Sequence, residues 1–234
     1  GSEMCIRDSN TTATYSNYEL KNVGQIFYTH DITSQKFYHF GSDPTTLGKR
    51  KLEADFDPIE SALKKGGSVL IYVPKSHIYS KQIYGQFQKY ISMCQPIDDP
   101  IAIKMIDELK DYIGASTTDK LFYNSDMLEK LRCGIVVHHG SMPLTARLIL
   151  EHFTQQGFCK ICFATSTLEQ GINMPFDVVY LDRFEESKTL SVKNLIGRAG
   201  RSTAKPIFDF GSVILRPNAM SRFRKVYQKK NILS

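Results

Sequence analysis

The sequence predicts an α/β fold built on a mainly parallel sheet with helices on both faces. Two observations lead to this prediction. Short apolar segments of strand length recur along the 234 residues, and segments with helical spacing lie between most of them. The apolar segments are also nearly continuous rather than alternating, which is typical of parallel strands covered on both faces. A chain of this length buries about 70% of its unfolded surface, so a sizeable core can form.

The segment before residue 58 has a β-rich pattern. Residues 22–40 contain two runs rich in aromatic and β-branched residues, separated by Asp31, Ile32, Thr33 and Ser34, which predicts a hairpin or two short strands. Residues 41–58 are polar and contain glycine and proline, so we expect a loop or linker there.

From Pro58 onward, helices and strands alternate. Pro143 opens one helix at a position that proline favours, and Gly157 closes it. We expect helices over about 58–65, 77–93, 101–113, 126–131, 143–157 and 191–200. The expected strands are 68–73, 135–138, 160–164, 178–181 and 212–215.

The composition narrows the class of protein. A content of 41% hydrophobic and 23% charged residues excludes a collagen-like, low-complexity or wholly disordered chain. No apolar run reaches the roughly 20 residues that span a bilayer. Five cysteines, an odd and scattered set, favour a reducing compartment, and we expect a cytoplasmic protein. The net charge of +6 permits a polyanionic partner without requiring one.

The first nine residues, GSEMCIRDS, do not match the pattern that follows. They resemble the translation of a transposase sequencing adapter, and a cloning scar or a natural N-terminus are the alternatives. We expect residues 1–9 to be adapter-derived or tag-like, with the gene continuing upstream.

Ligands of parallel α/β sheets bind at the carboxyl ends of the strands, and three sequence segments fall there. In the first, a strand runs into three consecutive hydroxyl residues, which can donate to phosphate oxygens. Glycine and asparagine then follow, allowing close approach of a ligand and amide hydrogen bonds. The alternative is that the hydroxyls only cap a helix. The residues of this segment are Thr165, Ser166, Thr167, Gly171 and Asn173.

The second segment contains two arginines three positions apart, Arg198 and Arg201, with Gly197 and Gly200 spaced in the same way. Residues at this spacing share one helical face. Each glycine costs a helix about 1 kcal/mol relative to alanine, which suggests close packing against something. Paired guanidinium groups can neutralise the charge of a phosphoryl group in transfer. A solvated basic helix end is the alternative.

The third segment is His138, His139 and Gly140. Neighbouring side chains on a strand point to opposite faces, so the two histidines do not suit a shared metal. A histidine at the end of a strand can instead bind a nucleic-acid backbone or phosphate, with ordinary packing as the alternative.

Together these segments resemble the C-terminal RecA-like domain of superfamily 2 helicases, nearest the Ski-like and Lhr-like DExH branch. The resemblance implies a three-layer RecA-like domain over residues 58–217, preceded by a short β-rich linker. The matching stretches are SVLIYVPKS (68–76), VVHHGSMPLTARLILEHF (136–153), FATSTLEQGINMP (163–175) and NLIGRAGR (194–201).

The resemblance also implies roles for individual residues. It implies that the hydroxyl loop of Thr165, Ser166 and Thr167 binds the nucleic-acid backbone. We also expect His138, His139 and Gly140 to bind nucleic acid. The resemblance places the nucleotide cleft at Gly171, Asn173 and Asn194, the last standing where this branch usually has glutamine. It assigns the action on the ATP phosphates, as arginine fingers, to Arg198 and Arg201. The family often has His-His-Ala-Gly where this chain has Gly140 directly after the histidines, so the contacts of this loop differ.

The resemblance covers one half of a two-domain motor. ATP with Mg²⁺ is the implied cofactor, and the magnesium ligands belong to an upstream RecA-like domain of the same polypeptide. The partners are DNA or RNA, held by backbone contacts to a single strand, and no membrane. We expect 10–57 to be the linker after the missing domain, 95–130 an insertion and 218–234 the start of a truncated extension. We also expect the chain alone to hydrolyse ATP negligibly.

Other functions remain as alternatives. One is a nucleic-acid-binding or scaffolding module without its own ATPase activity. Another is metal or redox chemistry at Cys159 and Cys162, which we disfavour because residues three apart on a strand face opposite sides and no second such pair completes four zinc ligands.

Overall fold

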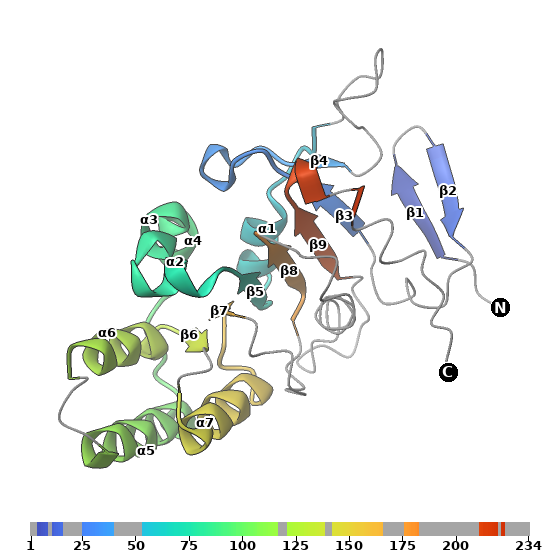
Figure 1. The fold of residues 1–234 in the computed structure, drawn as a ribbon. Helices are drawn as coiled ribbons and strands as arrows, with labels where there is room; N and C mark the ends of the chain where they lie inside the picture. The colour runs from blue at the N-terminus through green and yellow to red at the C-terminus, as the bar shows by residue number, and fades with distance from the viewer. Residues whose placement is uncertain are drawn as a thin grey trace, which may run out of the picture.

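The fold is described from a computed structural model of the chain. It describes residues 4–8, 11–15, 25–39, 53–116, 121–138, 142–165, 176–182, 211–219 and 221–222. Within these residues, seven strands form one sheet in the order β4-β3-β9-β8-β5-β7-β6 (Figure 1). Every pairing in this sheet is parallel except that of β4 with β3. The predicted α/β class with a mainly parallel, RecA-like sheet is confirmed.

The strands of this sheet are short. They are β3 (Gln25–Tyr28), β4 (Tyr38–His39), β5 (Val69–Tyr72), β6 (Ile135–His138), β7 (Ile161–Ala164), β8 (Val178–Leu181) and β9 (Ser212–Leu215). A separate antiparallel pair joins β1 (Met4–Asp8) to β2 (Thr11–Tyr15). The five central strands lie within one or two residues of the predicted positions, because continuous apolar runs bounded by polar residues mark buried strands clearly.

Helices cover both faces of the sheet. They are α1 (Pro58–Lys64), α2 (Lys75–Tyr79), α3 (Gln82–Gln86), α4 (Gln88–Ile91), α5 (Pro100–Ser116), α6 (Leu121–Arg132) and α7 (Leu144–Gln155). Short 3₁₀ helices follow at Ile32–Ser34 and Pro217–Ala219.

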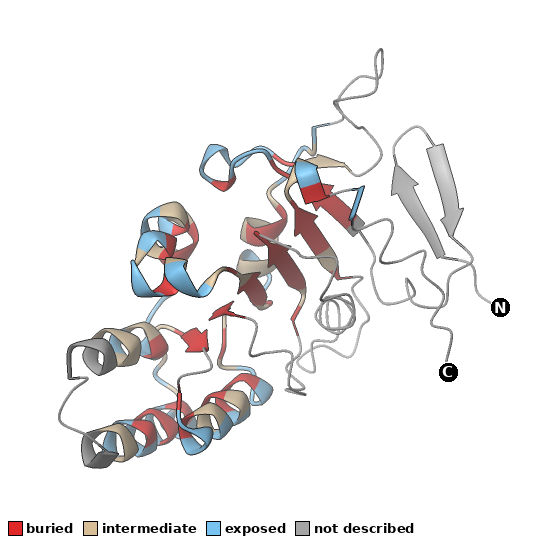
Figure 2. Cartoon of the chain, in the orientation of Figure 1, coloured by how far each residue is buried: buried red, intermediate tan, exposed pale blue. Residues whose placement is uncertain are grey.

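Alternating side chains of each strand enter two different cores. On β5, Leu70 packs with the helices α5, α6 and α7, whereas Val69 and Ile71 pack with α1 to α4. Successive side chains of a strand point to opposite faces of the sheet, and here helices cover both faces, so each strand contributes to both cores. Figure 2 shows that most residues of the central strands are buried; the exceptions in β5 and β9 are the intermediate Tyr72 and Ser212. The three layers therefore follow from strands that are apolar on both faces.

The N-terminal hairpin belongs to this same sheet. β3 and β4 pair as the predicted antiparallel hairpin, with Tyr28 opposite Tyr38. β3 also runs parallel to β9 over its four residues, and Ile26, Phe27 and Tyr28 are buried. The sheet thus extends upstream of the boundary predicted at residue 58, because β3 is apolar on both faces and needs cover on both.

The prediction of one continuous helix over residues 77–93 is wrong, because three short helices, α2, α3 and α4, cover this segment. The first break is at Lys81, whose φ of +59° is in the left-handed region. The change of direction lets Ile83, Phe87 and Tyr90 face the sheet. Apolar spacing identified the helical character of this segment but not the turn within it.

Two helices occupy most of the predicted insertion at 95–130. Asp99 accepts a hydrogen bond from the amide of Ile101 at 2.8 Å and so caps the start of α5. Ala102, Ile106 and Leu109 of α5 pack in the core that α6 and α7 share. These helices form part of the layer over one face. That the segment is an insertion stays a prediction.

A polar network fixes α1 against α4. Asp57 caps α1 by accepting from the amides of Ile59 and Glu60, and its other oxygen accepts from the Tyr90 hydroxyl at 2.7 Å. Lys89 donates to Glu60 at 2.8 Å. Burial, followed by the charge of Asp57, raises the pKa of Tyr90 far above its ordinary value.

Among the described helices, none has the length and apolar character needed to cross a membrane.

Two glycines make a matched pair for a stability test. Gly134 has a φ of +75°, and a Cβ added there would lie 2.7 Å from the Phe158 carbonyl oxygen; Gly66 has a φ of +74° with nothing within 4 Å. Gly66→Ala should cost about 1–2 kcal/mol of unfolding free energy from backbone strain alone. Gly134→Ala should lower the unfolding free energy further, because the added Cβ would clash with the Phe158 carbonyl oxygen. The start of β6 would then have to move away from the turn that precedes β7. Equal losses in urea unfolding would contradict this steric role.

The ion pairs of Glu60 predict a pH dependence of stability. Hydrogen bonds from Lys64 and then Lys89 lower the pKa of Glu60 from 4.5 to about 2. A depressed carboxyl pKa gives stability that is complete above the unfolded value and is lost as the pH falls toward the folded value. Between pH 5 and 2.5, the midpoint of urea unfolding should therefore fall less in Glu60→Gln than in wild type. Glu108→Gln, an exposed carboxylate on α5, is the control and should follow wild type.

Candidate functional site

The carboxyl edge of the sheet brings together polar residues from several strands. Past the ends of the strands, backbone hydrogen bonds continue from Val73 to Ala164 at 2.9 Å and from Asp182 to Tyr72 at 3.1 Å. The ends of β5, β7 and β8 are thus held in line. Since ligands of open α/β sheets bind outside the carboxyl ends of their strands, this edge is the candidate site.

His138 and Thr165 lie side by side at this edge. His138 ends β6 opposite Ala164 of β7, and the amide of Thr165 donates to the His138 carbonyl at 3.3 Å. The structure therefore places together the starts of two segments that the sequence selected separately. His138 is fully buried and Thr165 is 3% exposed. Their burial suits them to fix the backbone where the two strands end rather than to present their own side chains to a ligand.

The other selected residues lie outside the described residues. They are His139, Gly140, Ser166, Thr167, Gly171, Asn173, Asn194, Arg198 and Arg201. Their roles in strand and nucleotide binding stay predictions.

A buried carboxylate, missed by the sequence analysis, is the centre of a second polar group at this edge. Asp182, 7% exposed, follows β8 directly. Its Oδ1 is 3.1 Å from Nε of Arg216, which follows β9, and 3.4 Å from the Tyr180 hydroxyl. Its Oδ2 is 3.8 Å from Nδ1 of His77 on α2. We call Asp182, Arg216, Tyr180 and His77 the Asp182 cluster.

The opposite charges of Asp182 and Arg216 stabilise each other within the Asp182 cluster. Partial burial works against the Arg216 cation, but the hydrogen bond with Tyr180 and the charge of Asp182 outweigh it and raise the pKa of Arg216. Burial, and then the same carboxylate, raises the pKa of Tyr180 to about 12. Asp182 and Arg216 thus form an ion pair while Tyr180 keeps its proton at neutral pH.

A simple sequence signal could have found this cluster. Asp182 and Arg216 are each the first residue after a buried strand, which is the position where the chain leaves the core at the carboxyl edge. The three segments selected from the sequence stand out as known phosphate-binding patterns or as runs of hydroxyl or basic residues. Single charged residues at strand ends fit neither.

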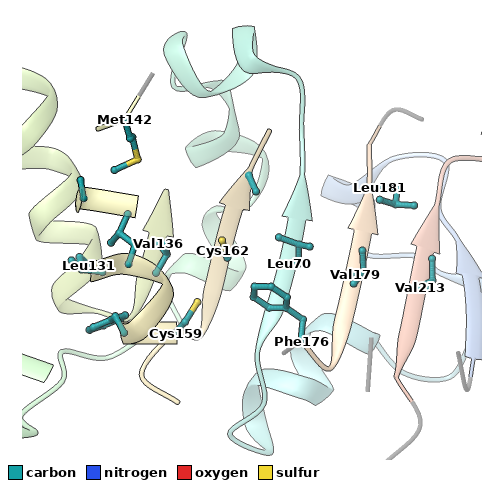
Figure 3. Close-up of a cluster of buried hydrophobic side chains, with 14 of the residues drawn as sticks. Leu70, Leu131, Val136, Met142, Cys159, Cys162, Phe176, Val179, Leu181 and Val213 are labelled. Carbon is teal, nitrogen blue, oxygen red and sulfur yellow. The ribbon is translucent and has the colours of Figure 1, made fainter. Parts of the chain in front are cut away.

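The cysteine pair corrects another expectation. Cys159 and Cys162 lie in the same core cluster, not on opposite faces of the sheet (Figure 3). The reason is that Cys159 precedes β7 and a bend at Lys160 separates them, so strand alternation does not apply. A hydrogen bond between the two thiols and then burial raise the pKa of Cys162 well above its ordinary value. Within the described residues, no group of three or more His, Cys, Asp or Glu side chains could hold a metal ion.

Residues 101–203 match the family described as the helicase conserved C-terminal domain. The match contains all the residues that the sequence selected at the carboxyl edge, from His138 to Arg201. It also begins within the segment 95–130.

Individual proteins are similar to this chain over stretches of different length. The ATP-dependent DNA helicase Hel308 of Caldivirga maquilingensis is 25% identical over 164 residues, which is 65% of this chain and 20% of that protein. The Hachiman protein HamB of Bacillus cereus is 38% identical over 84 residues, 34% of this chain and 8% of that protein. Superkiller complex protein 2 of Mus musculus is 34% identical over 97 residues, which is 38% of this chain and 8% of that protein. The chain spans a fifth or less of the length of these relatives.

Burial predicts an order of thiol reactivity. Cys94, Cys159 and Cys162 are buried and Cys133 is partly exposed. Burial raises the pKa of Cys94 to about 11, so little thiolate is present at pH 8. Of these four, Cys133 should be alkylated first by iodoacetamide in the native protein, as measured by peptide mass spectrometry over time. Equal rates at Cys133 and Cys162 in folded protein would contradict the structure.

Proposed function

We propose that this chain, which matches the helicase conserved C-terminal domain over residues 101–203, is the second motor domain of an ATP-dependent nucleic-acid helicase or translocase. The observation that supports this most directly is the neighbouring position of His138 and Thr165 at the carboxyl edge. Two loops that the family resemblance connects with strand binding therefore start from the same place, inside the segment that matches the family.

We assign strand binding to the loops that start at His139 and Ser166. His138 and Thr165, both buried, hold the starts of these loops on adjacent parallel strands. Ser166 and Thr167 then donate hydroxyl hydrogen bonds to phosphate oxygens, and Gly140 allows the backbone to approach. Such contacts recognise phosphates rather than bases, so binding is largely independent of sequence and sensitive to salt.

We assign the nucleotide side of the domain to the two segments that precede and follow β8. Arg198 and Arg201 supply positive charge to the phosphates of ATP, while Gly171, Asn173 and Asn194 line the cleft. Magnesium ligands belong to the upstream RecA-like domain in this proposal. Closing and opening of the two domains around ATP then moves the strand past the loops of this domain.

The second candidate is a nucleic-acid-binding module without its own ATPase activity. The observation that favours it is a partly exposed cation within the described residues at the carboxyl edge, Arg216, which is paired with Asp182. ATP hydrolysis by the whole protein separates the two candidates.

Strand binding by the chain is the first test. Each hydroxyl hydrogen bond to a phosphate contributes about 1–2 kcal/mol, so the double variant Ser166→Ala, Thr167→Val should bind single-stranded DNA or RNA at least about tenfold more weakly. Fluorescence anisotropy with a labelled homopolymer of each kind measures this. Ser92→Ala, an exposed hydroxyl at the end of α4, is the control. Unchanged affinity in the double variant would remove the assigned loop contact.

The arginine assignment needs the full-length protein. Arg201→Ala should lower strand-stimulated ATP hydrolysis by about 10³-fold, the usual contribution of an arginine finger, while strand binding is retained. Lys104→Ala on the exposed side of α5 should leave turnover unchanged. Normal turnover in Arg201→Ala contradicts the assignment, and a full-length wild type that binds strands but does not hydrolyse ATP favours the binding module.

A further inference from the structure

We propose that Arg216 is a further phosphate contact for the single strand, beyond the loops after β6 and β7, and that the Asp182 cluster holds it in place. This inference rests on the proposed function, because it extends the path of the same strand along the carboxyl edge.

Arg216 lies on the same edge of the sheet as Thr165. Both residues come directly after parallel strands, and the strands between them are β5 and β8. With strands about 4.8 Å apart, the three steps from β7 to β9 span about 14 Å. A stacked strand rises about 3.4 Å per nucleotide along its axis, so about four nucleotides cover this span.

The guanidinium group is fixed on one side and open on the other. Its Nε is buried and makes no hydrogen bond within the described residues, but it lies 3.1 Å from Asp182 Oδ1 as an ion pair. The guanidinium group also interacts with the Tyr180 hydroxyl. The side chain as a whole is 42% exposed. A guanidinium has five N–H donors, so donors beyond those facing Asp182 and Tyr180 remain for a ligand. A planar fork held in this way loses little side-chain entropy when it binds a phosphate through two hydrogen bonds.

The cluster differs from a general basic patch. Asp182 is buried and balances much of the Arg216 charge, and Asp31, which is exposed and hydrogen-bonded to Thr33, lies near enough to act on Arg216. Long-range attraction of a polyanion is therefore modest here. The cluster instead holds the guanidinium N–H donors of Arg216 in a fixed position. This suits a phosphate of a strand that is already bound elsewhere along the carboxyl edge.

The neighbouring strand adds aromatic surface. His30, exposed after β3, has its ring 5.6 Å from that of Tyr38 and 5.8 Å from that of Tyr28. Thr29 donates its amide to the Leu215 carbonyl at 2.9 Å, so His30 is close along the edge to Arg216. Single-strand sites commonly combine a cation for the backbone with a ring on which a base stacks. His30 supplies such a ring beside the Arg216 fork.

The test is the salt dependence of strand binding. For single strands, each phosphate contact contributes about 0.7 to the slope of log K against log salt. Arg216→Gln should therefore lower the magnitude of the slope by about 0.7 and weaken binding, as measured by anisotropy from 50 to 300 mM NaCl. Lys104→Gln removes the same charge from the exposed side of α5 and should leave the slope unchanged. His30→Ala should weaken binding without changing the slope.

A second variant separates loss of the Arg216 contact from loss of folding. Arg216→Gln alone leaves Asp182 buried without its cation, which can cost several kcal/mol of stability. The double variant Asp182→Asn, Arg216→Gln replaces the ion pair by two neutral amides, and thermal melting checks that it is folded. It should show the same loss of slope as the single variant.

The outcomes separate this inference from the proposed function. If wild type does not bind single strands, both are overturned. If wild type binds and the Ser166→Ala, Thr167→Val variant is weaker, but the folded Asp182→Asn, Arg216→Gln variant keeps the wild-type slope, the Arg216 contact alone is overturned.

Discussion

Burial of the parallel strands on both faces is the constraint on which the rest of the structure depends. Each central strand contributes alternate side chains to two separate cores, so no polar group can be placed along its length without a partner. Chemistry is therefore confined to the ends of the strands. At the carboxyl edge, polar residues follow the strands directly, and the parallel hydrogen bonds bring residues from distant parts of the sequence into one row.

The two groups along this row differ in their physical character. At β6 and β7, His138 and Thr165 are buried where the two strands end, so their side chains do not face solvent. At β8 and β9, Asp182 and Arg216 form an ion pair in which the carboxylate is buried and the guanidinium side chain is partly exposed. The first arrangement fixes the backbone at two strand ends, and the second fixes the position of one side chain. A strand bound at this edge would meet both kinds.

The sequence predicted the parts of the fold that depend on local pattern. Continuous apolar runs identified β5, β6, β7, β8 and β9, and Pro143 with Gly157 marked the limits of α7. Long-range pairing was not visible in the same way: nothing local to residues 25–28 indicates that they pair with β9. The turn at Lys81 was also missed, because a left-handed residue other than glycine has no clear local signature. Of the site, known motifs selected His138 and Thr165, whereas the Asp182 cluster depends on tertiary contacts between single residues.

The pairing of β3 with β9 joins residues that are far apart in the sequence. During synthesis, β3 emerges before its parallel neighbour β9, and for that time it has only its antiparallel partner β4. Until then, one edge of an apolar strand is without its ladder of hydrogen bonds, a state prone to association with other chains. Non-local parallel pairing is also slow to form. Recovery of native protein should therefore depend on chaperones and on the rate of translation more strongly than the small size of the domain suggests.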